Sequence, residues 1–179
     1  MSPTPVPDPP PTTSVLIGQW AVARAPAILR TLLGSCVAII LHDRAARVGG
    51  MAHIMLPDSR GRADGVGKYV DTAVPALLDD LARVQGRPLI GRSTFSATLV
   101  GGAAMFRSAP NADIGRQNLE AAERILQSLR IPVLARDAGG TTGRNVTLDT
   151  ASGVVRVRIP GGPSYDLSAG VARIERPET

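Results

Sequence analysis

Short β-rich runs, with only two stretches of helical periodicity between them, most constrain how this chain folds. Residues of strand-forming type dominate seven runs: 15–24, 28–43, 47–57, 94–106, 131–140, 145–150 and 154–159. The runs do not alternate with helices in a regular βαβ repeat, so a mixed sheet is expected rather than a purely parallel one. The pattern predicts an α/β (α+β) fold: a single domain with mixed, mostly antiparallel β-sheet layers packed against helices.

Two helices are predicted from apolar residues that recur at helical spacing. The first covers 67–84, with Pro75 inside it marking a kink or a later start. The second covers 111–130, with Asp113 as its N-cap. The apolar stripe expected on the second helix consists of Leu119, Ala122, Leu126 and Leu129.

The chain length and its N-terminal composition set the expected domain boundaries. A chain of 179 residues with 44% apolar residues suits one compact domain, because domains typically hold about 100–200 residues. Residues 1–14, "MSPTPVPDPPPTTS", are rich in Pro and Thr and have little to bury. We therefore expect a disordered Pro-rich tail over 1–14 and one domain over 15–179.

Composition also argues against several classes of function. The net charge of +5 comes from scattered basic residues without a basic run, and aromatic residues are only 3%, so nucleic-acid binding is not expected. One cysteine and two histidines make a structural zinc site improbable, and no phosphate-binding or dinucleotide-binding glycine motif occurs, so no metal or organic cofactor is expected. The absence of a signal segment and of a long apolar run predicts a cytoplasmic protein without membrane insertion.

The single cysteine, Cys36, has two interpretations. A lone cysteine before an apolar run is usually a small buried hydrophobic residue. However, if Asp43–Ala46 form a four-residue turn, the flanking runs pair as an antiparallel hairpin with Cys36 directly opposite His53. The Cβ atoms of such partners lie about 4.5–5.5 Å apart on one face of the sheet. His42, six residues along the strand, lies too far from the thiol and is expected to be a solvated turn residue.

A thiol beside an imidazole is a pairing that suits nucleophilic catalysis. The imidazole can take the thiol proton and later return it to a leaving group, while the thiolate attacks a carbonyl carbon. The small residues Gly34 and Ser35 leave space for that carbonyl, and their backbone N–H groups are candidate oxyanion donors. Gly49, Gly50 and Ala52 are expected to leave room beside the imidazole in the same way.

Several motifs in the same region resemble the CheD family, the chemoreceptor glutamine deamidases of bacterial chemotaxis. The motifs are "TLLGSCVAIILHD", "GGMAHIMLP", "KYVDTAVPALLDDL", "GGAAMF", "IGRQNLEAAERIL" and "DAGGTTGRNVTLDTASGVVRV", which follow the family's order from about Ile17 to Val157. The resemblance implies hydrolysis of glutamine side-chain amides in chemoreceptor cytoplasmic helices, without a cofactor. It also implies that a CheC-type phosphatase can be a partner.

Carried over residue by residue, the resemblance implies that Cys36 in "LGSC" is the nucleophile and His53 in "GGMAH" its partner. The family's third catalytic member, a threonine upstream of the cysteine, corresponds to Thr31. Because successive strand residues point to opposite faces, Thr31 shares a face with Cys36 only if the chain bends or bulges near Gly34. The competing interpretation of Thr31 is an ordinary surface threonine on a strand.

Two other functions are compatible with the same residues. A Cys–His hydrolase can act on receptor methyl esters or on another protein, because acyl transfer to a thiol does not by itself select an amide. A non-catalytic chemotaxis adaptor can keep the fold without the reaction. The intact Cys36 and His53 favour an enzyme.

Overall fold

The structure is a computed structural model, and it describes residues 8–86, 94–105, 113–167 and 172–175. The strands are β1 (Thr12–Ser14), β2 (Trp20–Arg24), β3 (Ile28–Leu33), β4 (Val37–Asp43), β5 (Val48–Ile54), β6 (Ser96–Gly101), β7 (Val133–Gly139), β8 (Arg144–Asp149), β9 (Val155–Arg158), β10 (Ser164–Leu167) and β11 (Ala172–Glu175). The helices are α1 (Val70–Gln85) and α2 (Ile114–Ser128), with a short 3-10 helix at Val66–Lys68.

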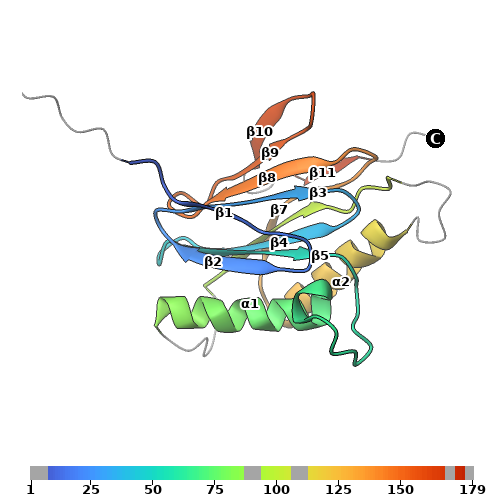
Figure 1. Cartoon of the computed structure of the whole chain (residues 1–179), viewed down its shortest axis with the longest axis horizontal. Coiled ribbons are helices and arrows are strands. Elements are labelled where there is room, and N and C mark those ends of the chain that lie inside the picture. The colour runs from blue at the N-terminus through green and yellow to red at the C-terminus, as the bar shows by residue number, and fades with distance from the viewer. Residues whose placement is uncertain (1–7, 87–93, 106–112, 168–171, 176–179) are drawn as a thin grey trace, which may run out of the picture.

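Two mixed sheets lie face to face, and both α-helices cover the outer face of one of them (Figure 1). One sheet has the strand order β1-β3-β8-β9-β10, and the other has the order β11-β7-β6-β4-β5-β2. Helix α1 packs on β5 and β2, whereas α2 packs on β7, β4 and β6. The expected α+β domain, with mixed sheet layers packed against helices, is confirmed.

The apolar side chains form two cores because the strands of the six-stranded sheet are buried on both faces. Along β4, Ile39 and Leu41 face the helices and pack with Leu77 of α1 and Leu126 of α2. Ile40, between them in sequence, faces the other sheet and packs in a second core. Alternate residues of one strand therefore enter different layers, as the two-residue period of a strand requires.

The chain passes directly from one sheet to the other at the cysteine motif. β3 ends at Leu33 in the five-stranded sheet, and β4 begins at Val37 in the six-stranded sheet. Only Gly34, Ser35 and Cys36 connect them. The run expected over 28–43 is thus two strands in different sheets, and the cysteine lies at the crossover between them.

The N-terminal end of the described chain joins the five-stranded sheet. Thr12–Ser14, the last residues of the segment that the sequence suggests is a tail, form β1 and pair in parallel with Ile28–Arg30 of β3. This strand leads to Val15, which is buried in the core between the sheets. Backbone pairing, rather than side-chain burial, accounts for β1, because its own side chains are exposed. Residues 1–7 lie outside the described part of the chain.

Both predicted helices form, with differences that follow from packing. α1 begins at Val70 and continues through Pro75, so Pro75 does not mark a later start; at this early position the missing proline N–H affects only the Asp71 carbonyl. Asp113 is the N-cap residue of α2, as predicted, but its side chain makes no capping hydrogen bond and instead accepts one from Arg116. Its buried face differs from the expected stripe: Leu129 is exposed, and the residues buried are Gly115, Asn118, Ala121, Ala122 and Leu126.

The N-terminal end of α2 approaches the end of β6 very closely, and glycine lies on both sides of the contact. A Cβ atom added at Gly115 would lie 2.5 Å from the carbonyl oxygen of Gly102. Gly102 itself has a φ of +69°, a conformation that side chains other than glycine's rarely adopt. The "GG" of "GGAAMF" is therefore a close contact between helix and sheet.

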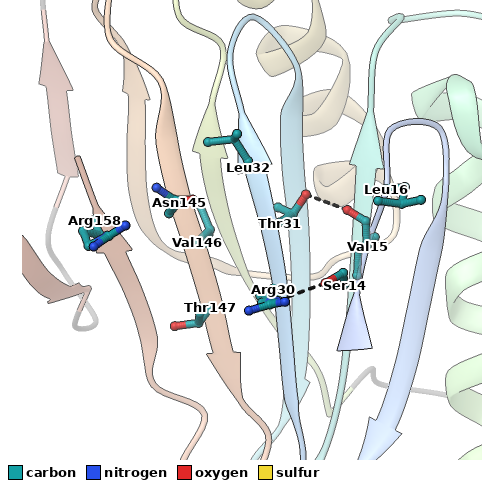
Figure 2. A pocket seen from close by; sticks show the side chains of 10 residues that line it. All are labelled: Ser14, Val15, Leu16, Arg30, Thr31, Leu32, Asn145, Val146, Thr147 and Arg158. Atoms are coloured by element: carbon teal, nitrogen blue, oxygen red, sulfur yellow. Dashed lines mark hydrogen bonds between the residues drawn. The ribbon is translucent and has the colours of Figure 1, made fainter. Parts of the chain in front are cut away.

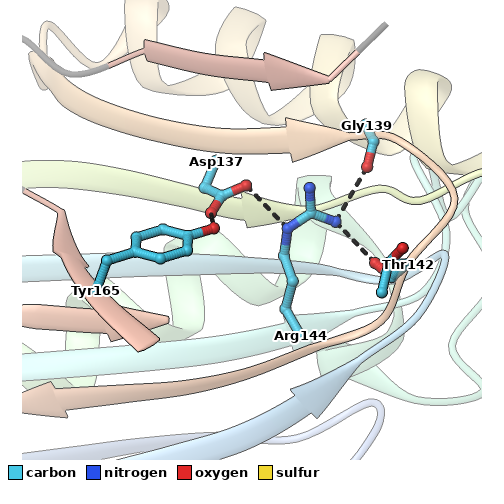
Figure 3. Close-up of polar contacts among 5 residues, drawn as sticks. All are labelled: Asp137, Gly139, Thr142, Arg144 and Tyr165. Carbon is cyan, nitrogen blue, oxygen red and sulfur yellow. Dashed lines mark hydrogen bonds and ion pairs between the residues drawn. The ribbon is translucent and has the colours of Figure 1, made fainter. Parts of the chain in front are cut away.

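A buried ion pair lies at the end of β7 and the start of β8 (Figure 3). Arg144 Nε donates to Asp137 Oδ1 over 2.9 Å, and Arg144 Nη1 donates to the carbonyls of Gly139 and Thr142, each over 3.0 Å. The Tyr165 hydroxyl donates to the second oxygen of Asp137. Side-chain exposure is only 1% for both charged residues. The pair thus fixes the turn between β7 and β8 from inside.

Candidate active site

The loop that carries the thiol is held by the segment after β6. The carbonyl of Cys36 accepts a hydrogen bond from Gly102 N over 2.9 Å, and the carbonyl of Gly34 accepts one from Ala103 N over 3.1 Å. A Cβ atom at Gly101 would lie 2.3 Å from the Cys36 carbonyl oxygen, so this approach requires glycine. The backbone of the crossover loop is thus fixed to the end of β6. Its side chains are free of these bonds, and that of Cys36 lines a pocket.

The β4–β5 hairpin has the expected four-residue turn, but one residue later in the chain. Asp43 pairs with Val48, so the turn residues are 44–47, and Arg47 adopts a positive φ of 52°. Asp43 stays in the strand because its buried carboxylate accepts hydrogen bonds from Ala46 N and the Gln85 side chain. The partner of His53 is therefore Ala38, and the expectation that Cys36 lies directly opposite His53 is wrong.

The difference between the expected and the observed hairpin register does not change the face on which His53 lies. A one-residue shift of the turn moves each cross-strand partner by two residues, and two residues restore the original face. Cys36 packs against the core between the sheets, and Ala38, the strand partner of His53, belongs to that core. Cys36 immediately precedes β4, so it has no strand partner, and it lies two residues before Ala38, the partner of His53.

Thr31 reaches His53 from the opposite sheet. Thr31 Oγ1 lies 2.8 Å from His53 Nδ1, and the threonine hydroxyl also donates to the carbonyl of Val15 over 2.7 Å. Thr31 points inward from β3, with a relative exposure of 8%, so it is not a surface threonine. The sheet crossover at Gly34 supplies the change in direction that brings Thr31 to the same site.

The threonine contacts determine which ring nitrogen of His53 carries the proton. The Thr31 hydroxyl has one proton, and it is used by the Val15 carbonyl, which can only accept. Thr31 Oγ1 must then accept the hydrogen bond from His53 Nδ1–H. In the neutral ring this leaves the lone pair on Nε2, the nitrogen that is free to act as a base.

All three residues line one pocket of about 390 Å³ between the ends of the sheets. Its walls are formed by Val15, Leu16, Ile17, Thr31, Leu32, Gly34, Ser35, Cys36, His53 and Met105. The thiol is half-buried there. The structure therefore brings Cys36, His53 and Thr31 to a common site that opens to solvent. Their catalytic roles stay predictions.

Burial favours the neutral forms of both Cys36 and His53. It raises the pKa of the Cys36 thiol above 9.0, because the thiolate is poorly solvated there. It lowers the pKa of His53 below 6.5 for the same reason, an effect partly offset by the carbonyl of Val15, which favours the protonated ring. At neutral pH the pocket thus holds a neutral thiol and a neutral imidazole, and the unprotonated ring nitrogen can accept a proton.

The other residues that the sequence places near the site are packed in the interior and do not line the pocket. His42 is buried rather than solvated, with Nε2 3.0 Å from the Thr150 carbonyl oxygen. Gly49 and Gly50 do not leave room beside His53: added Cβ atoms would lie 2.7 Å from Leu148 and from Leu77, respectively. Ala52 packs in the core under the helices, on the opposite face from His53. These residues set the spacing between layers.

Three features of the pocket were not expected from the sequence. The Val15 carbonyl orders Thr31, the Gly101–Ala103 backbone holds the thiol loop, and Met105 covers Gly34, whose added Cβ would lie 2.5 Å from Met105 Sδ. Only "GGAAMF" carries a sequence signal for these contacts.

Within the described residues, no group of three or more His, Cys, Asp or Glu side chains is arranged to hold a metal ion. None of the described helices is long and apolar enough to cross a membrane.

Removing the Thr31 hydroxyl should impair the site through His53. Thr31→Val leaves the Val15 carbonyl and His53 Nδ1 without their shared partner, and a lost buried hydrogen bond of about 1–3 kcal/mol corresponds to roughly a 5- to 150-fold loss of activity. The kinetic constants of Thr31→Val and Thr31→Ser provide the measurement. Ser retains the hydroxyl, so it should recover most of kcat; equal losses in both variants would show that the hydroxyl is unimportant.

Comparison with known proteins shows the family to which the chain belongs. A family model described as CheD chemotactic sensory transduction matches residues 55–159, which is more than half of the chain. The chain belongs to the CheD family.

Individual relatives are similar over most of their length. The chain is 44% identical over 146 residues to the "Probable chemoreceptor glutamine deamidase CheD" of Methanococcus maripaludis, an alignment covering 80% of this chain and 92% of the relative. It is 42% identical over 147 residues to the "Chemoreceptor glutamine deamidase CheD" of Thermotoga maritima, covering 82% and 90%. A relative in Thermococcus kodakarensis is 41% identical, covering 79% and 89%.

Proposed function

We propose that this chain is a protein-glutamine deamidase that converts selected glutamines of chemoreceptor cytoplasmic helices to glutamates. Membership of the CheD family supports the reaction class, and the relatives' name, chemoreceptor glutamine deamidase, supports chemoreceptors as the substrate. The observation that carries the proposal is the pocket in which Cys36, His53 and Thr31 meet, with Thr31 bonded to His53.

The proposed reaction begins with proton transfer within the pocket. His53 Nε2 takes the thiol proton of Cys36, and the thiolate attacks the glutamine side-chain carbonyl carbon to form a tetrahedral intermediate. The protonated imidazole then donates its proton to the amide nitrogen, the C–N bond breaks, and ammonia leaves. Backbone N–H groups of the Gly34–Cys36 loop are the proposed donors to the oxyanion.

The second half of the reaction releases the enzyme. His53, neutral again, removes a proton from water, and the resulting hydroxide attacks the thioester carbonyl. The C–S bond breaks, and the sulfur regains a proton from the imidazolium. The sum is amide plus water giving carboxylate and ammonium. Throughout, Thr31 keeps Nδ1 protonated and the ring oriented, which is a positioning role.

We also propose the setting in which the enzyme acts. Its substrate segments are cytoplasmic, so the enzyme is assigned to the cytoplasm. A CheC-type phosphatase is proposed as a regulatory partner on the family resemblance alone. Co-purification of the two proteins at a fixed stoichiometry tests that partnership, and independent migration at micromolar concentrations of both would contradict it.

The test of the proposed function is the reaction itself on a receptor fragment. A purified chemoreceptor cytoplasmic fragment is incubated with the full chain, and the tryptic peptides are analysed by mass spectrometry. Replacement of an amide NH₂ by a hydroxyl at particular glutamines is the expected result. Loss of methyl groups with unchanged glutamines would instead identify an esterase. Binding without any covalent change would identify an adaptor, and either outcome would overturn the proposal.

The depressed pKa of His53 predicts the pH dependence of the reaction. Only the neutral ring can accept the thiol proton, so kcat/KM should fall as pH decreases through a midpoint below 6.5. Because the thiol pKa is raised, alkylation of Cys36 by iodoacetamide should be slow at neutral pH and should still be rising at pH 9.0. Profiles of kcat/KM and of alkylation rate against pH test both statements. Full thiolate reactivity at pH 7 would contradict the neutral pair.

The same pKa predicts a loss of stability in acid. The folded protein holds His53 with a pKa below its unfolded value of 6.5, so the unfolded chain binds the proton more readily. The contribution is fully present above pH 6.5 and is lost as pH falls through the folded pKa. Denaturation midpoints of the wild type should decrease more in this range than those of His53→Gln, which lacks the titrating group.

A further inference from the structure

A second groove continues from the active-site pocket along the five-stranded sheet (Figure 2). It encloses about 430 Å³. Its walls are formed by Ser14, Val15, Leu16, Arg30, Thr31, Leu32, Asn145, Val146, Thr147 and Arg158. Four of these residues also line the pocket of the thiol: Val15, Leu16, Thr31 and Leu32. The two hollows therefore share a wall.

The part of this surface nearest the thiol is apolar. Leu16 is 61% exposed, Ile17 is 55%, Leu32 is 61% and Met105 is 46%, and all four line the active-site pocket. Large apolar side chains that gather at an opening, instead of being scattered, mark a surface for another molecule. Their position at the thiol means that whatever they contact lies across the entrance to the site.

The far part of the surface carries two exposed arginines without a counter-charge. Arg30 extends from β3, where its Nε donates to Ser14 Oγ over 3.0 Å, and Arg158 extends from β9. Neither forms an ion pair with any residue in the described part of the chain. The lining contains no carboxylate.

A neighbouring arginine on the same strand, Arg156, does have a carboxylate partner. Arg156, two residues before Arg158 on β9, forms a two-point ion pair with Asp166 of β10 at 2.6 and 3.1 Å. Both arginines are exposed, yet only Arg158 lines the groove. The arginines that line the groove, Arg30 and Arg158, are therefore the ones available to bind an anion from another molecule.

We propose that these two parts form one docking track for an acidic, amphipathic helical segment of the substrate protein. Apolar side chains of that helix lie on Leu16, Ile17, Leu32 and Met105, which places a glutamine at Cys36. Carboxylates one or two turns away on the same face bind Arg30 and Arg158. The inference rests on the proposed function, and it adds the chemistry by which a target glutamine is selected.

Carboxylates are favoured as the occupant over neutral groups because guanidinium groups bind them through paired, charge-assisted hydrogen bonds. Opposite charges also accelerate the encounter of enzyme and substrate at low ionic strength. One consequence concerns the product. Each glutamate that the enzyme makes adds a carboxylate to the receptor helix, so it can improve docking for a glutamine one or two turns away.

The test measures binding separately from turnover. In the Cys36→Ala background, affinity for a chemoreceptor cytoplasmic fragment is compared between unchanged arginines and the double change Arg30→Gln with Arg158→Gln. The dissociation constant should rise by about 5- to 30-fold at low salt, as two exposed charge pairs predict, and the difference should shrink at high salt. Arg156→Gln is the matched control on the same strand and face, and it should have little effect.

A second fragment identifies the partner group. In this fragment, acidic residues within two turns of the target glutamine are replaced by alanine. The neutral fragment should bind enzyme with unchanged arginines as weakly as the original fragment binds the double variant. The double variant should bind the neutral fragment and the original fragment with the same affinity. Unchanged affinity in the double variant, an equal loss in Arg156→Gln, or an equal further loss with the neutral fragment would overturn the docking track.

The kinetic form of the test separates this inference from the proposed function. With active enzyme, the double variant should raise KM while kcat stays within about twofold, since the reacting groups are unchanged. If the wild type does not deamidate the fragment at all, the proposed function fails, and the binding comparison still decides the docking track. If the wild type is active and the arginines are without effect on KM, only the docking track fails.

Discussion

Replacement of Cys36 by alanine is expected to reduce glutamine deamidation by at least about a thousandfold, the scale seen when an enzyme loses its nucleophile. The thiol is the only sulfur nucleophile in the chain, and it lies half-buried in the pocket that also holds His53. The hydroxyls of Thr31 and Ser35 cannot replace it, because the first is committed to Val15 and a serine hydroxyl is a much weaker nucleophile than a thiolate. Conversion of receptor peptides, followed by mass spectrometry, measures the loss.

Two companion variants separate chemistry from folding. His53→Gln should lower kcat by about 100- to 10,000-fold, the usual contribution of a general acid–base group. His42→Gln is the matched control, because His42 is the other histidine, is also buried, and contacts Thr150 away from the pocket. It should lose stability at most. Comparable activity in Cys36→Ala and wild type would eliminate the thiol mechanism.

The buried pair of Arg144 and Asp137 should give the largest effect on stability. Arg144→Met leaves the Asp137 carboxylate in a site with 1% exposure, and breaking such a pair costs about 3–5 kcal/mol. The carbonyls of Gly139 and Thr142 lose their donor in the same variant. Urea denaturation of Arg144→Met and of wild type measures the difference in the free energy of unfolding.

The double replacement tests whether the cost comes from the stranded charge. Adding Asp137→Asn to Arg144→Met removes the carboxylate, so the double variant should be more stable than the sum of the single losses predicts. Tyr165→Phe removes the hydroxyl bond to Asp137 and should cost about 1–2 kcal/mol. A loss below 1 kcal/mol in Arg144→Met would show that the pair contributes little.

The same network should influence activity at a distance. The turn that Arg144 holds includes Gly140, whose carbonyl accepts a hydrogen bond from Ala104 N over 2.8 Å. Ala104 precedes Met105, which covers Gly34 beside the thiol. The ion pair therefore supports the wall of the pocket as well as the core.

The sequence points to three residues that the structure brings to one pocket, but the predicted geometry is partly wrong. Hydrophobic patterns predicted both helices, and the hairpin was found with the right turn length. The predicted turn is one residue too early, because Asp43 resembles a turn residue but is buried in β4. Its carboxylate accepts hydrogen bonds from Gln85 and Thr94, which are far away in the sequence. The error was harmless to the site only because it moved partners by an even number.

Thr31 shows what a one-dimensional pattern cannot contain. Its place in the site depends on the crossover between sheets, and a three-residue connection of Gly34, Ser35 and Cys36 reads in sequence as the middle of one long strand. The register with β8, where Thr31 pairs with Val146, then turns its side chain inward. Likewise, the stripe expected on α2 is wrong at Leu129, because the helix ends at Ser128 and Leu129 is its exposed C-cap residue.

Because of the crossover at Gly34–Cys36, the site is complete only when the two sheets are packed together. Thr31 and His53 belong to different sheets, and the cysteine lies on the strap between them, so no single sheet contains the complete set. If the two sheets separate, the imidazole loses the threonine that orients it. A nascent or damaged chain would therefore carry an ordinary cysteine, and hydrolytic competence would arise only when both layers have closed.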